Sequence, residues 1–146
     1  MKLHYFDFYG RAESIRFLAS HGKVQLETVI VEDESMPGLK ESGKLEFGQL
    51  PILEVDGKYL AQSWAILRFL GRQHGYYPSD PEVAYQIDST IDAVEDFSRA
   101  YPFPFLDEER KKAAKVTFLT NFLPNWLTAI EKRLKKNSSE KYIVGD

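Results

Sequence analysis

Cysteine is absent from this sequence of 146 residues. Without a thiol, the chain forms no disulfide bond, builds no cysteine-based zinc site and offers no cysteine nucleophile. A dithiol redox reaction carried out by the protein's own side chains is therefore excluded.

Long apolar runs and a strong excess of one charge are lacking as well. No stretch approaches the ~18 apolar residues of a membrane-spanning helix. Asp7 stands where a secretory signal would have its apolar region. The net charge of −3 gives no electrostatic attraction to nucleic acid or to an anionic membrane. We therefore expect a cytoplasmic protein with neither kind of partner.

The remaining composition is typical of a globular protein, with 43% hydrophobic and 28% charged residues. The length suffices for one ordinary domain or for two small ones packed together. No internal repeat or low-complexity tract is present. The three histidines, His4, His21 and His74, are scattered along the chain and suggest no metal site.

The stretch 47–70 organises the first half of the chain. Pro51 stands at the start of a short apolar run, Ile52–Val55, where a residue without an N–H is tolerated in a strand. Asp56-Gly57 suits the positive φ angles of a tight hairpin turn, and Lys58–Ala61 is predicted to be the returning strand.

A helix is predicted directly after this hairpin, because apolar residues recur at helical spacing within 64–70. Ser63 is expected to be its N-cap, and Gly71 or Gly75 to end it. The N-terminus of a helix offers free N–H groups and a partial positive charge, which attract carboxylates and phosphates. The junction is therefore a candidate anion pocket, and Leu50-Pro51 beside it is a candidate cis peptide bond.

The residues before this stretch predict a strand, a helix and a second strand. Lys2–Phe8 is rich in β-formers, Ala12–His21 has helical periodicity with Gly22 as terminator, and Leu26–Val31 again favours a strand. This order predicts a right-handed βαβ unit with parallel strands. With the hairpin it gives a four-stranded mixed sheet. Residues 32–46 are expected to form a long loop with one short helix.

The second half is predicted to be helical. Asp80 and Pro81 suit the cap and first turn of a helix that residues 101–104 would end. A second helix is predicted over 107–136, with a kink at Pro124. The expected core positions are Val83, Ile87, Ile91, Val94 and Phe97 in the first helix, and Phe118, Leu119, Phe122, Trp126, Leu127, Ile130 and Leu134 in the second.

Three blocks of sequence carry a family resemblance: K-L-H-Y-F-D-F-Y-G-R-A-E-S-I-R at 2–16, F-G-Q-L-P-I-L-E-V-D-G at 47–57 and A-Q-S-W-A-I-L-R-F-L at 61–70. In this order and separation they resemble the glutathione-binding half of cytosolic glutathione S-transferases. The sigma class is the most similar and the alpha class is next. In the family, the proline at position 51 follows a cis bond.

The resemblance implies a thioredoxin-like α/β domain over 1–78 and an all-helical domain over 79–146. In the family, the motif at 142–146, Y-I-V-G-D, leads into a buried central helix and further helices. The resemblance therefore implies a chain truncated at its C-terminus, with an incomplete helical domain.

Tyr5 is the catalytic candidate that the resemblance implies, because the tyrosine of K-L-x-Y-F donates its hydroxyl to the glutathione sulfur. A thiol pKa of about 8.5 falls when the thiolate accepts a hydrogen bond. Two units of lowering require roughly 2.7 kcal/mol, and one charge-assisted hydrogen bond contributes about 1.5–3 kcal/mol. Arg11, in G-R-A-E, would support the thiolate electrostatically. Ser14 matches no serine motif of other classes, and Arg16 suits a structural ion pair.

The resemblance also assigns the binding of glutathione, the cosubstrate. The backbone at Leu50-Pro51 would pair with its cysteinyl unit beside Gln49, and Gln62 with Ser63 would hold the γ-glutamyl carboxylate. Lys40 or Lys44 would hold the glycyl carboxylate, although this loop is about two residues longer than the sigma pattern and Met36 replaces its usual tryptophan. Asp96 would reach the glutathione of a partner subunit, which implies a homodimer.

Other interpretations remain open at this point. Tyr5 could be a core aromatic residue, Arg11 a solvated cation, and the acidic face with Asp92, Glu95 and Asp96 simply hydrated. Some sigma-class interfaces bind a divalent cation there, but we predict no metal. The predicted activity is addition of glutathione to a hydrophobic electrophile, or a prostaglandin isomerisation. The alternatives are a non-catalytic glutathione-binding or crystallin-like relative, or an inactive fragment.

Overall fold

The computed structural model describes residues 1–101, 106–139 and 141–145. The chain divides into two compact units, Met1–Tyr77 and Pro78–Asp146, and each is described by itself. Within the described residues, no helix is both long enough and apolar enough to span a membrane.

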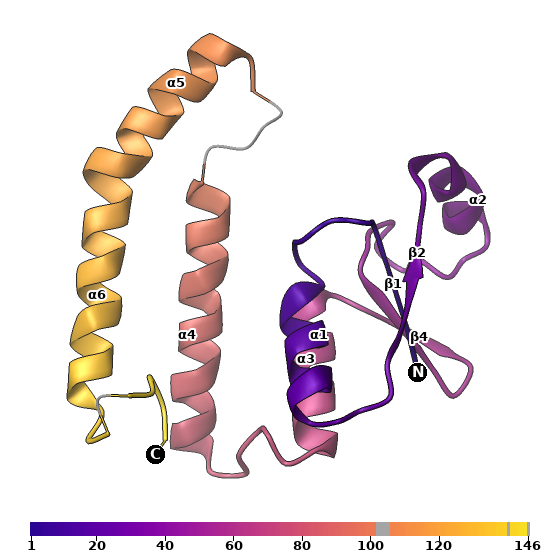
Figure 1. Ribbon diagram of the computed structural model, residues 1–146, viewed down its shortest axis with the longest axis horizontal. Helices are drawn as coiled ribbons and strands as arrows, with labels where there is room; N and C mark the ends of the chain where they lie inside the picture. Colours follow the sequence, from indigo (N-terminus) through magenta and orange to yellow (C-terminus); the bar gives the residue numbers. More distant parts are fainter. Residues whose placement is uncertain (102–105, 140, 146) are drawn as a thin grey trace. The chain divides into compact units, whose positions relative to one another are not determined.

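The first unit is built on a four-stranded mixed sheet (Figure 1). Its strands are β1 (Lys2–Tyr5), β2 (Glu27–Ile30), β3 (Ile52–Val55) and β4 (Lys58–Ala61), in the order β2-β1-β3-β4. Strand β1 is parallel to β2 and antiparallel to β3, and β3 is antiparallel to β4. The predicted sheet is confirmed, as is the Asp56-Gly57 turn, in which both residues have positive φ.

The first strand is shorter than expected, since it ends at Tyr5 rather than Phe8. Beyond Tyr5 the chain leaves the sheet in a series of bends and turns that lead into helix α1 (Glu13–His21). The sequence pattern did not predict this early end of the strand, because Phe6 and Phe8 are strong β-forming residues. In the structure their rings stack on each other, and neither residue pairs with a neighbouring strand.

Helices α1 and α3 (Ser63–Gln73) lie next to each other on one face of the sheet (Figure 1). They close a core whose largest completely buried side chains come from both helices and from β1 and β3: Leu3, Ile15, Ile52, Leu53, Ile66 and Leu70. The segment after β2 forms a short 3₁₀ turn, η1 (Asp33–Ser35), and helix α2 (Met36–Glu41), so the expected long connection with one short helix is confirmed.

Ser63 is not the N-cap of α3, which corrects the prediction. Gln62 occupies the cap position with φ of 71°, makes no side-chain capping bond, and Ser63 is the first helical residue. The sequence pattern misleads because Ser63 is buried, with 5% exposure, and belongs to the packed start of the helix. Of the two predicted terminators, Gly71 lies inside the helix, and Gly75 follows its end with φ of 77°.

The second unit contains three helices, α4 (Pro81–Ala100), α5 (Glu108–Thr117) and α6 (Leu123–Lys136), among its described residues. Asp80 caps α4 as predicted, because its carboxylate accepts from the backbone N–H groups of Glu82 and Val83. Tyr101 ends α4, while the predicted breakers at 102–104 lie outside the described residues.

The predicted helix over 107–136 is interrupted by a π-helical turn, η2 (Phe118–Phe122), where the N–H of Leu123 bonds to the carbonyl of Phe118. Pro124, which has no N–H, follows directly and cannot donate to the carbonyl of Thr120. The widened turn is therefore found where the proline was expected to disturb the helix.

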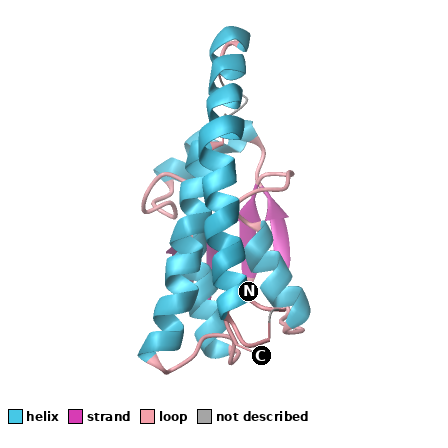
Figure 2. Cartoon of the chain, turned by 90° about the vertical axis from the view of Figure 1, so that its left-hand side faces the viewer, coloured by secondary structure: helices cyan, strands magenta, loops and turns pink. Residues whose placement is uncertain are grey.

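Helices α4 and α6 run side by side in opposite directions (Figures 1 and 2). The indole N–H of Trp126 donates to the carbonyl of Ala93 at 2.8 Å, and the ring of Phe97 lies 4.8 Å from that of Trp126. Leu119 and Leu127, both expected in the core, are 47% and 51% exposed. They lie one residue, or about 100° of helix, past the stripe that contacts α4, so this prediction was wrong.

Candidate functional site

The register of the sheet brings the candidate residues of the first unit to one end. His4 pairs with Ile52, and Ile52 pairs with Ala61. Because both pairings are antiparallel, the last residue of β1, Tyr5, lies at the end of the sheet where β3 begins and β4 finishes. Three segments that are far apart in the sequence therefore meet there.

The second of these segments is the bend before β3. The Leu50-Pro51 peptide bond is cis, which confirms the sequence prediction. Both residues are buried, while Gln49 is exposed. The main chain at Leu50 thus forms a fixed, packed border beside the end of β1.

The third segment is the start of α3. Gln62 is an exposed non-glycine residue with φ of 71° and ψ of 109°. Such a conformation costs of order 1–3 kcal/mol and is found mainly at ligand sites and active sites. It turns the chain sharply from β4 into the helix, so the N–H groups that open the first helical turn, beginning with that of Ser63, lie at this end of the sheet.

Tyr5 is 4% exposed, and its ring belongs to the core cluster. Its hydroxyl oxygen accepts a hydrogen bond from the backbone N–H of Arg11 at 3.0 Å. The residues next to the hydroxyl, Phe8 and Gly10, are exposed, so this oxygen lies just beneath the surface rather than deep in the core.

The bond from Arg11 determines what the phenol can do. A phenolic oxygen accepts and donates, and here its accepting side is engaged by an amide. No acceptor for its own hydrogen occurs among the described residues. The hydroxyl is therefore held as a donor for an outside atom. Arg11 contacts it through the main chain, which sequence reasoning about the guanidinium charge did not foresee.

The two candidate lysines lie in different environments. Lys40 is exposed on α2. The ammonium nitrogen of Lys44 lies 5.1 Å from the ring centre of Tyr59. Tyr59 pairs with Glu54, which pairs with Lys2, so all three lie on the face of the sheet opposite to the Tyr5 side chain.

That opposite face carries a histidine–glutamate hydrogen bond that sequence reasoning missed. His4 Nε2 lies 2.9 Å from a carboxylate oxygen of Glu54. The hydrogen bond from His4 is the main cause that lowers the pKa of Glu54 below its ordinary value, against a smaller opposing effect of burial. The pairing follows from the alternation of β1, in which Lys2 and His4 share a face, and this could have been read from the sequence once β3 was aligned with β1.

In the second unit, Asp96 is exposed on α4, with Asp92 and Glu95 nearby. Glu95 accepts from Arg99 at 3.2 Å. Asp96 borders an apolar cavity of about 390 Å³ that Trp126 also lines. In the part of the chain that the structure describes, no three or more His, Asp or Glu residues are grouped to hold a metal ion.

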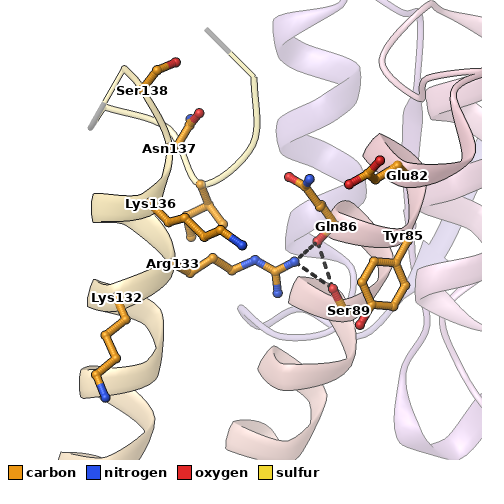
Figure 3. A pocket seen from close by; sticks show the side chains of 10 residues that line it. Glu82, Tyr85, Gln86, Ser89, Lys132, Arg133, Lys136, Asn137 and Ser138 are labelled. Carbon is orange, nitrogen blue, oxygen red and sulfur yellow. Dashed lines mark hydrogen bonds between the residues drawn. The ribbon is translucent and has the colours of Figure 1, made fainter.

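A second cavity of this unit, of about 730 Å³, lies between the first half of α4 and the end of α6 (Figure 3). Arg133 crosses it and donates to the carbonyl of Gln86 at 2.9 Å and to the hydroxyl of Ser89 at 2.8 Å. Lys132 and Lys136 also line it. The only sign of this cavity in the sequence is the basic last turn of α6, with Arg133, Lys135 and Lys136. Basic residues are common at the C-terminus of any helix because they interact favourably with its dipole, so this sign does not point to a cavity.

Comparisons with known proteins show which proteins the chain resembles. The family model described as glutathione S-transferase, N-terminal domain, matches residues 1–72. The chain is 33% identical over 144 residues to a hematopoietic prostaglandin D synthase of Gallus gallus, covering 99% of this chain and 70% of that protein. It is 38% identical over 149 residues to glutathione S-transferase 1 of Ascaris suum, with 99% and 71% covered.

Among solved structures, a prostaglandin synthase D of Nilaparvata lugens superposes with a TM-score of 0.86 at 35% identity. The match covers 98% of this chain and 71% of that one. Both the sheet with its helices and the helical second unit thus have close counterparts of known structure.

Proposed function

Because the chain belongs to the glutathione S-transferase family, we propose that it binds glutathione, stabilises its thiolate and adds it to a hydrophobic electrophile. Members of the family use glutathione as cosubstrate, and the chain has no thiol of its own. The observation that carries the proposal is the Tyr5 hydroxyl, held by the Arg11 amide with its own hydrogen available.

In the proposed reaction, the glutathione thiol gives its proton to solvent and the Tyr5 hydroxyl donates a hydrogen bond to the sulfur. A thiol pKa of about 8.5 is thereby lowered toward neutrality. The thiolate attacks an electrophilic carbon, forming a carbon–sulfur bond, and the electron pair of the broken bond leaves with the displaced group. Exposed Phe8, next to the hydroxyl, gives the electrophile an apolar surface.

The tripeptide would lie across the end of the sheet. We assign its cysteinyl unit to the main chain of Leu50, next to Gln49 and cis-Pro51, and its γ-glutamyl carboxylate to Gln62, Ser63 and the first turn of α3. The N–H groups and partial positive charge of that turn support the second assignment.

For the glycyl carboxylate we propose Lys40 rather than Lys44. The contact of Lys44 with Tyr59, on the face of the sheet opposite to Tyr5, supports this choice. Arg11 would add positive charge near the sulfur, and Asp96 would contact the glutathione of a second subunit in a homodimer.

We assign the chain to the sigma class and propose prostaglandin isomerisation as a specialised activity. The similarity to the synthases of Gallus gallus and Nilaparvata lugens supports both. Incubation with prostaglandin H2 and glutathione, followed by chromatography of the products, tests the second proposal. We further propose a cytoplasmic location and a division into a glutathione-binding domain over 1–78 and a helical domain over 79–146.

The decisive experiment measures conjugation of glutathione to 1-chloro-2,4-dinitrobenzene by the full chain and by Tyr5→Phe. The variant is expected to lose about 10²-fold in rate, because the oxygen that stabilises the thiolate is gone. Tyr76→Phe is the matched control, since it removes an exposed hydroxyl and keeps its ring contact with His21. Equal activity of both variants would contradict the role of Tyr5. Glutathione binding without turnover by the unmodified chain would favour a non-catalytic relative.

A further inference from the structure

Gly10 approaches Tyr5 more closely than any other residue type could. A Cβ atom placed on Gly10 would lie 2.6 Å from the Tyr5 hydroxyl oxygen and 3.0 Å from Cε2 of Phe8. Ordinary contacts of a Cβ atom begin at about 3.4 Å. Gly10 is not among the glycines with positive φ, so its backbone conformation does not require glycine. Glycine is needed at position 10 because only a residue without a side chain lets the backbone come this close to the Tyr5 hydroxyl.

The Tyr5 side chain has no room to retreat from such a Cβ atom. Its ring is packed in the core, with the rings of Phe6 and Phe8 at 5.6 and 5.4 Å and the guanidinium of Arg16 5.8 Å from its centre. Relief of the contact from 2.6 to 3.4 Å requires a shift of roughly 0.8 Å. That shift must be taken by the exposed loop, which includes the amide of Arg11.

We propose that Gly10 is a positioning residue of the transferase reaction. Its lack of a side chain lets the Gly10-Arg11 peptide reach the Tyr5 hydroxyl, so that the Arg11 N–H fixes the phenolic oxygen and directs its hydrogen to the sulfur. This inference rests on the proposed function, and Gly10 acts through Tyr5 without taking part in the chemistry itself.

The chain provides a matched control for a glycine-to-alanine change. Gly38 lies in α2, its φ is not positive, and a Cβ atom there would have no neighbour within 4 Å. Gly38→Ala is therefore expected to leave both activity and folding unchanged. It adds the same methyl group where no contact can result.

The test is a double-mutant cycle with Gly10→Ala, Tyr5→Phe and the double variant, measured in the full chain. Gly10→Ala is expected to lower kcat about 10²-fold, because a displacement near 1 Å is enough for that loss. The pKa of the bound glutathione thiol, followed by thiolate absorbance, should rise toward the free value of about 8.5. Glutathione binding by calorimetry should weaken less than about threefold, since the main-chain contacts of the tripeptide are kept.

The same glycine change should have almost no further effect in Tyr5→Phe, because the hydroxyl that it displaces is no longer there. Such non-additivity is the signature of one residue acting through another. An equal loss in both backgrounds, or an unchanged thiol pKa in Gly10→Ala, would overturn the inference.

Thermal unfolding covers the case in which Gly10→Ala folds poorly. Removal of the hydroxyl removes the closest contact at 2.6 Å, so the double variant should regain much of the lost melting temperature. If the double variant stays as unstable as Gly10→Ala, the contact is not with Tyr5 and the inference fails. An unmodified chain without conjugating activity would instead refute the proposed function itself.

Discussion

At the scale of single residues, the most informative atom is the phenolic oxygen of Tyr5. Its residue type and place were predictable from sequence, but its hydrogen-bond partner was not. The amide of Arg11 reaches it across six positions of the chain, through a loop whose bends no periodicity encodes. A sequence specifies which side chains are available near a site, while the orientation of a hydroxyl depends on main-chain geometry.

The two lysines of the α2 region give a residue-scale prediction. Lys40→Ala should raise the Kd for glutathione about fivefold, which corresponds to the ~1 kcal/mol of an exposed ion pair. Lys44→Ala should change it less than twofold, because the ammonium group lies over Tyr59 on the other face of the sheet. Calorimetric titration with glutathione measures both. If Lys44→Ala raises the Kd for glutathione more than Lys40→Ala does, Lys44 and not Lys40 binds the glycyl carboxylate.

The His4–Glu54 pair predicts a pH dependence of stability. The pKa of Glu54 is lowered in the folded chain, chiefly by the hydrogen bond from His4. A lowered folded-state pKa stabilises the fold above the unfolded value of about 4.3, and this stabilisation is lost as the pH falls through the folded value. Glu54→Gln should therefore lower the melting temperature at pH 7 and have a smaller effect at pH 3.

The control for this prediction is Glu46→Gln, which changes an exposed glutamate of the same unit. Its melting temperature should follow that of the unmodified chain at both pH values. The melting temperatures of Glu54→Gln and of the unmodified chain are compared at both pH values. If they differ as much at pH 3 as at pH 7, the charged carboxylate is not the source of the stabilisation.

At the scale of elements, strands and helices were largely predictable, and the errors lie at their ends and faces. The hairpin, the βαβ unit and the Asp80 cap follow from local chemistry that the sequence displays. Ser63 was misplaced because N-cap preference is a local rule, whereas a buried position within the unit determines where the helix starts. Leu119 and Leu127 were misplaced because an apolar helix residue does not reveal whether a neighbouring helix is present.

The cap of α4 gives an element-scale prediction. Asp80 accepts two backbone N–H groups, each at 2.9 Å, at the start of this helix. Asp80→Ala should lower the free energy of unfolding by about 1 kcal/mol, as is usual for the loss of an N-cap. Ser79→Ala, at the exposed neighbouring position, is the control. Urea denaturation followed by circular dichroism compares the two, and equal midpoints would contradict the capping role.

At the scale of the whole molecule, buried side chains are unevenly distributed between the two units. Nearly all of the buried apolar residues in the described part belong to Met1–Tyr77, and α4 contains none. Amide exchange slows where apolar burial protects the backbone. The amides of β1 and β3 should therefore exchange more slowly than those of α4, measured by mass spectrometry of deuterated peptides. Faster exchange in the strands would contradict this distribution of stability.

The proposed homodimer belongs to the same scale. Sedimentation velocity of the full chain should give one species of about twice 16.8 kDa. Asp96→Asn should weaken glutathione binding in that species without changing its mass, because the carboxylate is proposed to contact the neighbouring subunit's glutathione. A single monomeric species that binds glutathione would refute this role of Asp96.

The short span from Tyr5 to Arg11 holds both the donor and the group that steadies it. A single inserted or deleted amino acid within this span would separate them. The cis-proline bend and the N-terminus of α3 lie elsewhere in the chain and would stay as they are. Under the proposed function, such a change would leave the residues proposed to bind the tripeptide in place and remove the donor proposed for the reaction. One insertion or deletion would then convert a transferase into a protein that binds glutathione without turnover.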